Sequence, residues 1–150
     1  MKRPNREDTL MYIAETMALR STCLRRRVGC VISYEGRVIS TGYNGQPQPY
    51  TKTCETVCSL EDPCQIANHA EHNALELLRK TQPKTLAKEV VVYVTLSPCL
   101  ECAKKLYRVG IGHLVYLEEY RDNAGILFLR EKGINVTKHT YQWQFPRINS

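Results

Sequence analysis

The chain has 150 residues, of which 43% are hydrophobic and 24% charged, and its formal net charge is +6. These values are typical of a soluble globular protein whose length suits one hydrophobic core. No apolar run approaches the roughly 20 residues that span a bilayer, and the charged N-terminus is unlike a signal peptide. We therefore expect a cytoplasmic protein that has no membrane partner.

Apolar periodicity and turn residues predict an alternation of helices and strands along the chain. The first helix follows Asn5, a good N-cap, with Asp8 at the third helical position. A turn at Glu35-Gly36 joins two β-rich segments in a hairpin. In chain order, we expect a helix at 6–20, strands at 28–34 and 37–43, an irregular cysteine-rich insert at about 46–66, a helix at 68–79, a strand at 90–95, a helix at 99–109, a strand at 113–117, a helix at 124–131, a strand at 134–137 and an irregular tail at 138–150.

This alternation predicts one α/β domain over residues 1–150, in which a mixed sheet of about five strands has helices on both faces. Strands that a helix connects should lie parallel, through right-handed crossovers. We expect Ser97 to cap the helix that begins at Cys99, with Pro98 in its first turn. His69 and Cys99 then both lie at helix N-termini, whose positive ends favour thiolates and hydroxide.

Two short motifs carry the chemistry: His69-Ala70-Glu71 and Pro98-Cys99-Leu100-Glu101-Cys102. One histidine and two cysteines supply three zinc ligands, and a catalytic zinc keeps its fourth position open for water. We therefore assign His69, Cys99 and Cys102 to a catalytic Zn²⁺. Glu71 is assigned to the general base beside that ion. The order and spacing match the signature of zinc-dependent nucleobase deaminases.

The seven cysteines, in a reducing compartment, are more plausible as metal ligands or core residues than as disulfides. Cys30 alternates with apolar neighbours on a strand and is expected in the core. The remaining cysteines outside the catalytic motif surround the irregular insert. They form either a second, structural zinc site or a set of free thiols: Cys23, Cys54, Cys58 and Cys64.

Basic side chains are concentrated near the N-terminus, where residues 1–30 hold seven against three acids, or +4 of the net charge. Such a cluster attracts the phosphate groups of a nucleotide or of a nucleic acid. The triplet Arg25-Arg26-Arg27 would repel itself without a nearby anion or carboxylate. We expect one of these three arginines to hold a phosphate, and the sequence does not distinguish between them.

The likeness to a known family extends beyond the zinc motifs, over roughly residues 8–137. The sequence resembles deoxycytidylate (dCMP) deaminases, phage and bacterial members in particular, in these segments: 19–23, Arg25, 28–29, 42–45, 69–74, 93–95 and 97–103. The resemblance implies a three-layer cytidine-deaminase-like fold and the hydrolysis of dCMP to dUMP and ammonia, which supplies thymidylate synthesis. For a phage protein this would occur in the host cytoplasm. Glu71 would carry protons between the water, N3 of cytosine and the departing amine.

The resemblance also implies roles for single residues. Tyr120 matches a tyrosine that stacks on the substrate base, Asn44 a residue that bonds the deoxyribose hydroxyl, and Ser97 a position in the substrate-binding motif. Some family members hold a structural zinc at positions matching Cys23 and Cys54, and others lack it.

Regulation is implied in the same way. Members of this family are typically hexamers that dCTP activates and dTTP inhibits, with Mg²⁺ accompanying these triphosphates and no need for nucleic acid. Their allosteric motif matches Gly42-Tyr43-Asn44-Gly45. Arg79 and Lys80 are expected to meet a triphosphate from an adjoining subunit. The alternative is that the loop at 42–45 only positions Asn44 for the substrate sugar.

Other functions stay open at this stage. A tRNA adenosine deaminase shares the zinc chemistry, but it typically has tryptophan where this chain has Tyr43. A free cytidine deaminase would not need the arginine triplet. A non-catalytic zinc-stabilised nucleic-acid-binding module would have no use for Glu71 beside an open metal position.

Overall fold

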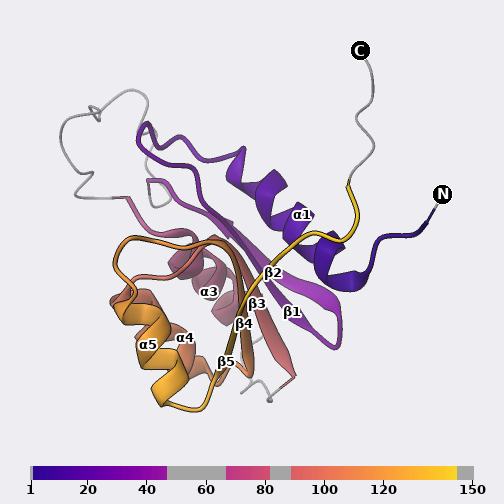
Figure 1. Ribbon diagram of the computed structural model, residues 1–150. Helices are drawn as coiled ribbons and strands as arrows, with labels where there is room; N and C mark the ends of the chain where they lie inside the picture. Colours follow the sequence, from indigo (N-terminus) through magenta and orange to yellow (C-terminus); the bar gives the residue numbers. More distant parts are fainter. Residues whose placement is uncertain (1, 47–66, 82–88, 145–150) are drawn as a thin grey trace.

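The computed structural model describes residues 2–46, 67–81 and 89–144 of the chain. Within these ranges, helices and strands alternate much as the periodicity predicts (Figure 1). No helix among them is both long and apolar enough to cross a membrane. The elements are α1 (Arg6–Ala18), β1 (Gly29–Tyr34), β2 (Arg37–Tyr43), α3 (Ala70–Thr81), β3 (Val90–Leu96), α4 (Leu100–Val109), β4 (His113–Glu118), α5 (Ala124–Glu131) and β5 (Asn135–Lys138).

The strands form a mixed five-stranded sheet in the order β2-β1-β3-β4-β5. β1 pairs antiparallel with both of its neighbours, whereas β3, β4 and β5 are parallel to one another. Parallel neighbours need a long connection, and α4 and α5 supply it. The carboxyl ends of β3 and β4 therefore lie side by side, which places the loops after Leu96 and Glu118 next to each other.

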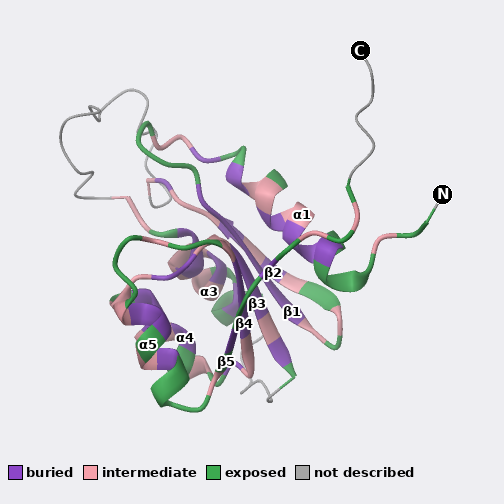
Figure 2. Ribbon diagram, viewed as in Figure 1, coloured by how far each residue is buried: buried purple, intermediate pink, exposed green. Residues whose placement is uncertain are grey.

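Helices cover both faces of the sheet, as predicted. α1 lies on one face, while α3, α4 and α5 lie on the other (Figure 1). Each face has its own apolar cluster: Met11 and Ala14 of α1 pack on Val31, and Leu106 and Leu129 pack on the opposite side. Figure 2 shows the sheet largely buried and the outward surfaces of the helices exposed.

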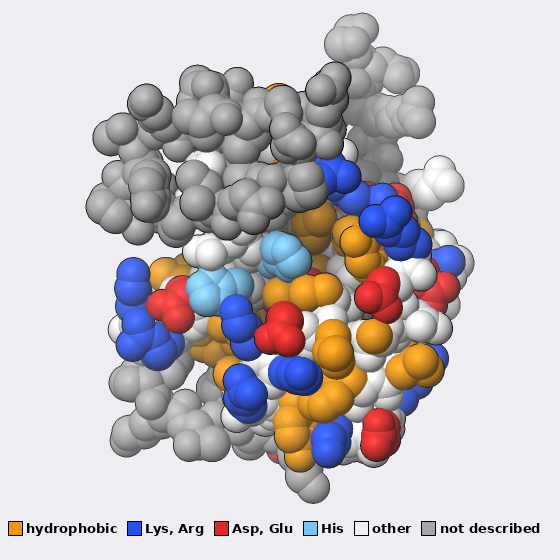
Figure 3. Space-filling view, turned by 90° about the vertical axis from the view of Figure 1, so that its left-hand side faces the viewer, with side chains coloured by type: hydrophobic (Ala, Val, Ile, Leu, Met, Phe, Trp, Pro, Cys, Tyr) orange, Lys and Arg blue, Asp and Glu red, His pale blue; other side chains and the backbone are white. Residues whose placement is uncertain are grey.

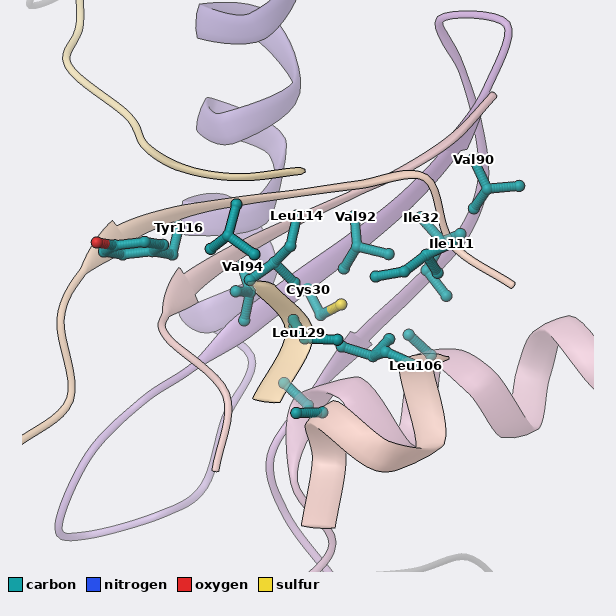
Figure 4. Packing of buried hydrophobic residues seen from close by; sticks show 14 of the residues in the cluster. Cys30, Ile32, Val90, Val92, Val94, Leu106, Ile111, Leu114, Tyr116 and Leu129 are labelled. Atoms are coloured by element: carbon teal, nitrogen blue, oxygen red, sulfur yellow. The ribbon is translucent and has the colours of Figure 1, made fainter. Parts of the chain in front are cut away.

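The core between the sheet and the three helices is made of β-branched and other aliphatic side chains. Val90, Val92 and Val94 of β3 are all fully buried, and Cys30 lies among them, as Figure 4 shows. Burial raises the pKa of the Cys30 thiol, so this residue is an unionised member of the core. The prediction that Cys30 is a core residue is confirmed.

Where the observed boundaries differ from the predicted ones, they differ by one or two residues, and one predicted capping residue is wrong. α4 begins after Cys99, which occupies the N-cap position, so Ser97 does not cap this helix. The Ser97 backbone N–H instead donates to the Glu118 carbonyl at 2.9 Å, which prolongs the sheet beyond the end of β3. Its hydroxyl accepts the Tyr120 backbone N–H at 2.7 Å. Ser97 thus joins the two loops at the carboxyl edge of the sheet.

The segment after β5 is irregular, as expected, but it is firmly attached to α1. The Asp8 carboxylate, fully buried, accepts the backbone N–H groups of Gln142 and Trp143 and lies 2.8 Å from His139 Nε2. The Asn5 side chain caps α1 through the Asp8 N–H at 2.7 Å, which confirms the predicted cap. Residues 47–66 and 145–150, which include most of the predicted insert and the end of the predicted tail, lie outside the described residues.

Candidate metal centre and active site

The first turns of two helices bring the predicted metal ligands together. His69 directly precedes α3, and Cys99 and Cys102 lie at the start of α4. His69 Nδ1 lies 3.6 Å from Cys99 Sγ and 3.4 Å from Cys102 Sγ. In the described part of the chain, this is the only group of three potential metal ligands whose donor atoms all lie within 4.8 Å.

Electrostatics at this cluster favour a cation. Hydrogen bonds from Cys102 and then from His69 lower the pKa of the Cys99 thiol to about 4. The hydrogen bond to Cys99 and burial raise the pKa of Cys102, so the negative charge of the pair resides on Cys99. The same Cys99 thiolate raises the pKa of His69 through a hydrogen bond. One imidazole nitrogen and two thiol sulfurs are the donor set of catalytic zinc sites that have three protein ligands. The residues present therefore fit Zn²⁺.

The Glu71 carboxyl group is buried in the first turn of α3, with only 4% of the residue exposed. Burial raises the pKa of this carboxyl group, while the nearby His69 acts in the opposite direction. A carboxyl group whose pKa moves toward neutrality is suited to accept and return a proton near pH 7. The position and environment of Glu71 support the predicted role as a base.

A cavity of about 570 Å³ opens beside the metal ligands. Its wall includes both His69 and Glu71, so a molecule inside it would face the metal and the base together. Most of the predicted substrate-binding residues contribute to the same wall: Arg25, Arg26, Asn44, Ser97 and Tyr120. Arg27 does not, and it lines a separate cavity beside α1. Of the arginine triplet, Arg25 and Arg26 are therefore the members that border the predicted active site.

Arg121 is a cavity residue that the sequence reasoning missed. It follows Tyr120 in the loop after β4, and no zinc motif includes it. The signal that could have found it is topological, because the carboxyl end of a parallel strand commonly carries site residues next to the neighbouring strand. Within the described part of the chain, neither Arg25 nor Arg121 has an ion-pair partner.

The Asn44 side chain is held by the backbone of the arginine loop. Its Oδ1 accepts the Val28 N–H at 2.8 Å, and its Nδ2 donates to the Arg26 carbonyl at 2.7 Å. The Asn44 carbonyl in turn accepts the Ser21 hydroxyl at 2.8 Å. Asn44 thus lines the cavity and also fixes the loop that carries Arg25 and Arg26. Its predicted bond to a sugar hydroxyl stays a prediction.

The other members of the 42–45 motif contact the start of α3. Gly45 and Asn68 exchange backbone hydrogen bonds of 3.1 and 2.8 Å, directly before His69. The Tyr43 carbonyl accepts the Asn73 amide at 2.8 Å. These contacts make the motif a brace for the metal-binding helix. Arg79 and Lys80 lie in the last turn of α3, far from this brace.

Two further sequence features lie near the site. Cys23 is partly buried and lines the cavity, whereas Cys54, Cys58 and Cys64 lie outside the described residues, so the second zinc stays a prediction. His72, expected on the helix surface, has Lys105 Nζ 3.0 Å from its Nδ1 and does not line the cavity.

Figure 3 views the side of the molecule that carries α3, α4 and α5, where histidine side chains lie at the surface beside lysine, arginine and acidic groups.

Comparison with known proteins agrees with this geometry. The family described as the cytidine and deoxycytidylate deaminase zinc-binding region matches residues 4–118. The chain is 35% identical to the deoxycytidylate deaminase of Saccharomyces cerevisiae over 99% of its own length, and it spans about half (49%) of that relative. It is 30% identical to the deoxycytidylate deaminase of Enterobacteria phage T2, with 95% of this chain and 93% of the relative covered.

A solved structure gives the same result. The dCMP deaminase of cyanophage S-TIM5, in complex with dCMP and dUMP, superposes with a TM-score of 0.82 at 30% identity, covering 93% of this chain and 100% of that one. The chain therefore belongs to the cytidine and deoxycytidylate deaminase family. The predicted cytidine-deaminase-like fold and the resemblance to this family are confirmed.

Proposed function

We propose that this chain converts dCMP to dUMP and ammonia by hydrolysis. The observation that carries the proposal is one cavity whose wall combines two of the three metal ligands, the buried Glu71, and two arginines, Arg25 and Arg121, that have no ion-pair partner among the described residues. The first two features supply the chemistry of deamination, and the arginines supply a reason for a phosphorylated substrate. Deoxycytidylate deaminases among the relatives support the same substrate.

The catalytic part rests on His69, Cys99 and Cys102, which would hold Zn²⁺. When bound there, zinc supplies a Lewis acid that brings the pKa of a coordinated water toward neutrality. Glu71 would accept a proton from the attacking water and deliver it to N3 of the cytosine ring, while the water oxygen bonds to C4. Glu71 would then move the proton of the new C4 hydroxyl group to the amine, so that the C4–N bond breaks and ammonia leaves. Burial of Glu71 keeps its carboxyl group available for both transfers.

Substrate recognition falls to other residues that line the same cavity. Arg25 and Arg121, on the loops before β1 and after β4, would hold the 5′-phosphate through charge-assisted hydrogen bonds. Tyr120 would stack on the base, and its backbone is fixed by the hydrogen bond to Ser97. Asn44 would contact the deoxyribose hydroxyl while it holds the arginine loop.

The test is a comparison of substrates. Purified protein with one zinc in the His69 site is assayed for ammonia release from dCMP, deoxycytidine, cytidine and the adenosine of tRNA. We expect dCMP to have the highest kcat/KM, by at least about 10²-fold over deoxycytidine, because charge-assisted hydrogen bonds to the phosphate would be lost. A preference for the unphosphorylated nucleosides, or for tRNA, would contradict the proposal.

Regulation and assembly are also part of the proposal. Arg79 and Lys80 lie roughly 10 Å along α3 from Asn73, the brace contact nearest to them, given 1.5 Å per helical residue. We therefore infer that they contact a nucleotide held by the brace of a neighbouring subunit, in a hexamer. dCTP with Mg²⁺ would act as activator and dTTP as inhibitor. Because Gly45 and Tyr43 contact the start of α3, a nucleotide at the brace would act directly on His69 and Glu71.

A further inference from the structure

Two cavities share one arginine. Besides the cavity at the metal ligands, a second one of about 420 Å³ lies between α1 and the carboxyl ends of β3 and β4. Arg26 contributes to the walls of both cavities, whereas Arg25 lines only the first and Arg27 only the second. Arg26 therefore lies at the boundary between the proposed substrate site and the α1 side of the sheet.

The Arg26 guanidinium is paired with Glu118, which lines only the cavity beside α1. The pair is open to solvent, with 50% of the Arg26 side chain and 64% of the Glu118 side chain exposed. Exposed pairs of this kind contribute little stability, so another anion can replace the carboxylate at small cost.

The backbones on both sides of this pair are fixed. The Arg26 carbonyl accepts the Asn44 amide at 2.7 Å. The Glu118 carbonyl accepts the Ser97 N–H at 2.9 Å, where Ser97 itself lines the metal cavity. The backbone therefore stays in place while the long Arg26 side chain, which is half exposed, can change its partner. Its charge is available either to Glu118 or to an anion in the metal cavity.

We propose that Glu118 is a specificity-determining residue, which competes with the substrate phosphate for the Arg26 guanidinium. This inference rests on the proposed function, since it needs a phosphorylated substrate in the metal cavity. With no phosphate bound, Arg26 pairs with Glu118. When a 5′-phosphate binds, the Arg26 guanidinium leaves Glu118 and pairs with the phosphate. When the product departs with that phosphate, Arg26 pairs with Glu118 again.

The competition has a direct consequence for affinity. Part of the attraction between Arg26 and the phosphate is offset by the loss of the Glu118 contact. Removal of the Glu118 charge should therefore strengthen binding of both dCMP and dUMP. Deoxycytidine has no phosphate and should bind as before. Glu118 thus weakens nucleotide binding in a way that favours product release.

The experiment compares Glu118→Gln with Glu131→Gln, which removes the same charge from an exposed position on α5 that lines neither cavity. We expect Glu118→Gln to lower the KM for dCMP and the inhibition constant of dUMP by about 1.5- to 5-fold, the range that exposed ion pairs contribute. The KM for deoxycytidine should stay unchanged in Glu118→Gln. In Glu131→Gln, the KM values and the inhibition constant should all equal those of the wild type.

A double variant tests whether Glu118 acts through Arg26. In an Arg26→Ala background, Glu118→Gln should have no further effect on dUMP binding. The inference is overturned if Glu118→Gln leaves or raises the KM for dCMP, if it changes deoxycytidine equally, or if its effect persists without Arg26. Calorimetric titration of the wild type, Glu118→Gln, Arg26→Ala and the double variant with dUMP tests the exchange independently of turnover. Absence of dCMP turnover in the wild type would overturn the proposed function instead.

Discussion

Gly42 of β2 lies against the first turn of α3 so closely that a Cβ at this position would be 2.4 Å from the Ala70 carbonyl oxygen. The same Cβ would lie 2.5 Å from the Ala74 backbone nitrogen. Only glycine allows the metal-binding helix to approach the sheet this far. The distance between β2 and α3 therefore depends on Gly42, and with it the position of His69 and Glu71.

Gly42→Ala should destabilise the fold and disturb the metal site. Because backbone atoms on α3 cannot yield without a shift of the whole helix, we expect a loss of about 1–3 kcal/mol in the free energy of unfolding. Gly45→Ala is the matched control, since the nearest atom to its Cβ is Thr22 Oγ1 at 3.7 Å. Urea denaturation of both variants measures the difference. Equal free energies of unfolding for the two variants would show that the close approach of Gly42 to α3 does not contribute to stability.

Metal removal should lower thermal stability. A zinc held by His69, Cys99 and Cys102 links the N-termini of α3 and α4, and it stabilises the folded chain by mass action. At 100 times the dissociation constant the gain is about 2.7 kcal/mol, so chelation should lower Tm by roughly 5–10 °C and added zinc should restore it. In His69→Ala, Tm should respond little to either treatment. If chelation leaves the Tm of the wild type unchanged, that result would contradict a zinc at this cluster.

Arg25→Ala and Arg121→Ala should each raise the KM for dCMP by about 10- to 100-fold, because a hydrogen bond to a charged group contributes about 1.5–3 kcal/mol. The kinetics of deoxycytidine should change little. Arg108→Ala removes a charge from an exposed position on α4 that lines neither cavity, and it serves as the control. Equal effects on both substrates would indicate that the two arginines act on the fold rather than on the phosphate.

Regulation is tested with the triphosphates in protein shown to be oligomeric. dCTP with Mg²⁺ should lower the half-saturating dCMP concentration, dTTP should raise it, and each should displace the other. Since coupling is reciprocal, dCMP should tighten dCTP binding by the same factor. Lys80→Ala should reduce both responses. Hyperbolic kinetics that neither triphosphate changes would remove the regulatory part of the proposal and leave the deaminase assignment intact.

The architecture could be predicted from local patterns. The β-branched run of β3, the hairpin turn at 35–36 and the Asn5 cap each depend on neighbours in sequence, and all three were confirmed. Ser97 was assigned wrongly as a cap. Its partners, Glu118 and Tyr120, lie on another strand and loop. A good capping residue looks the same in sequence whether a helix or a neighbouring strand uses it.

The candidate site also contains some residues that the sequence predicts and others that it does not. His69, Glu71, Cys99 and Cys102 could be found from spacing, because metal chemistry restricts the residue types. Arg121 and the pairing of Arg26 with Glu118 could not, since they depend on which strand ends lie side by side. The sequence also gives no indication of the role of Asp8. Its sequence position indicates a first-turn acid, whereas its main partners, His139 and Trp143, come from the far end of the chain.

In the proposed mechanism, Glu71 moves protons beside a zinc that it does not bind. Glu71→Gln keeps the shape of the side chain but cannot carry a proton. The direct measurement combines zinc content by elemental analysis with dUMP formation, on wild type and variant purified together. We predict that the variant retains its catalytic zinc and that kcat falls by at least about 10²–10⁴-fold, the range of general acid–base catalysis. Loss of the zinc, or retention of most of the activity, would contradict this account.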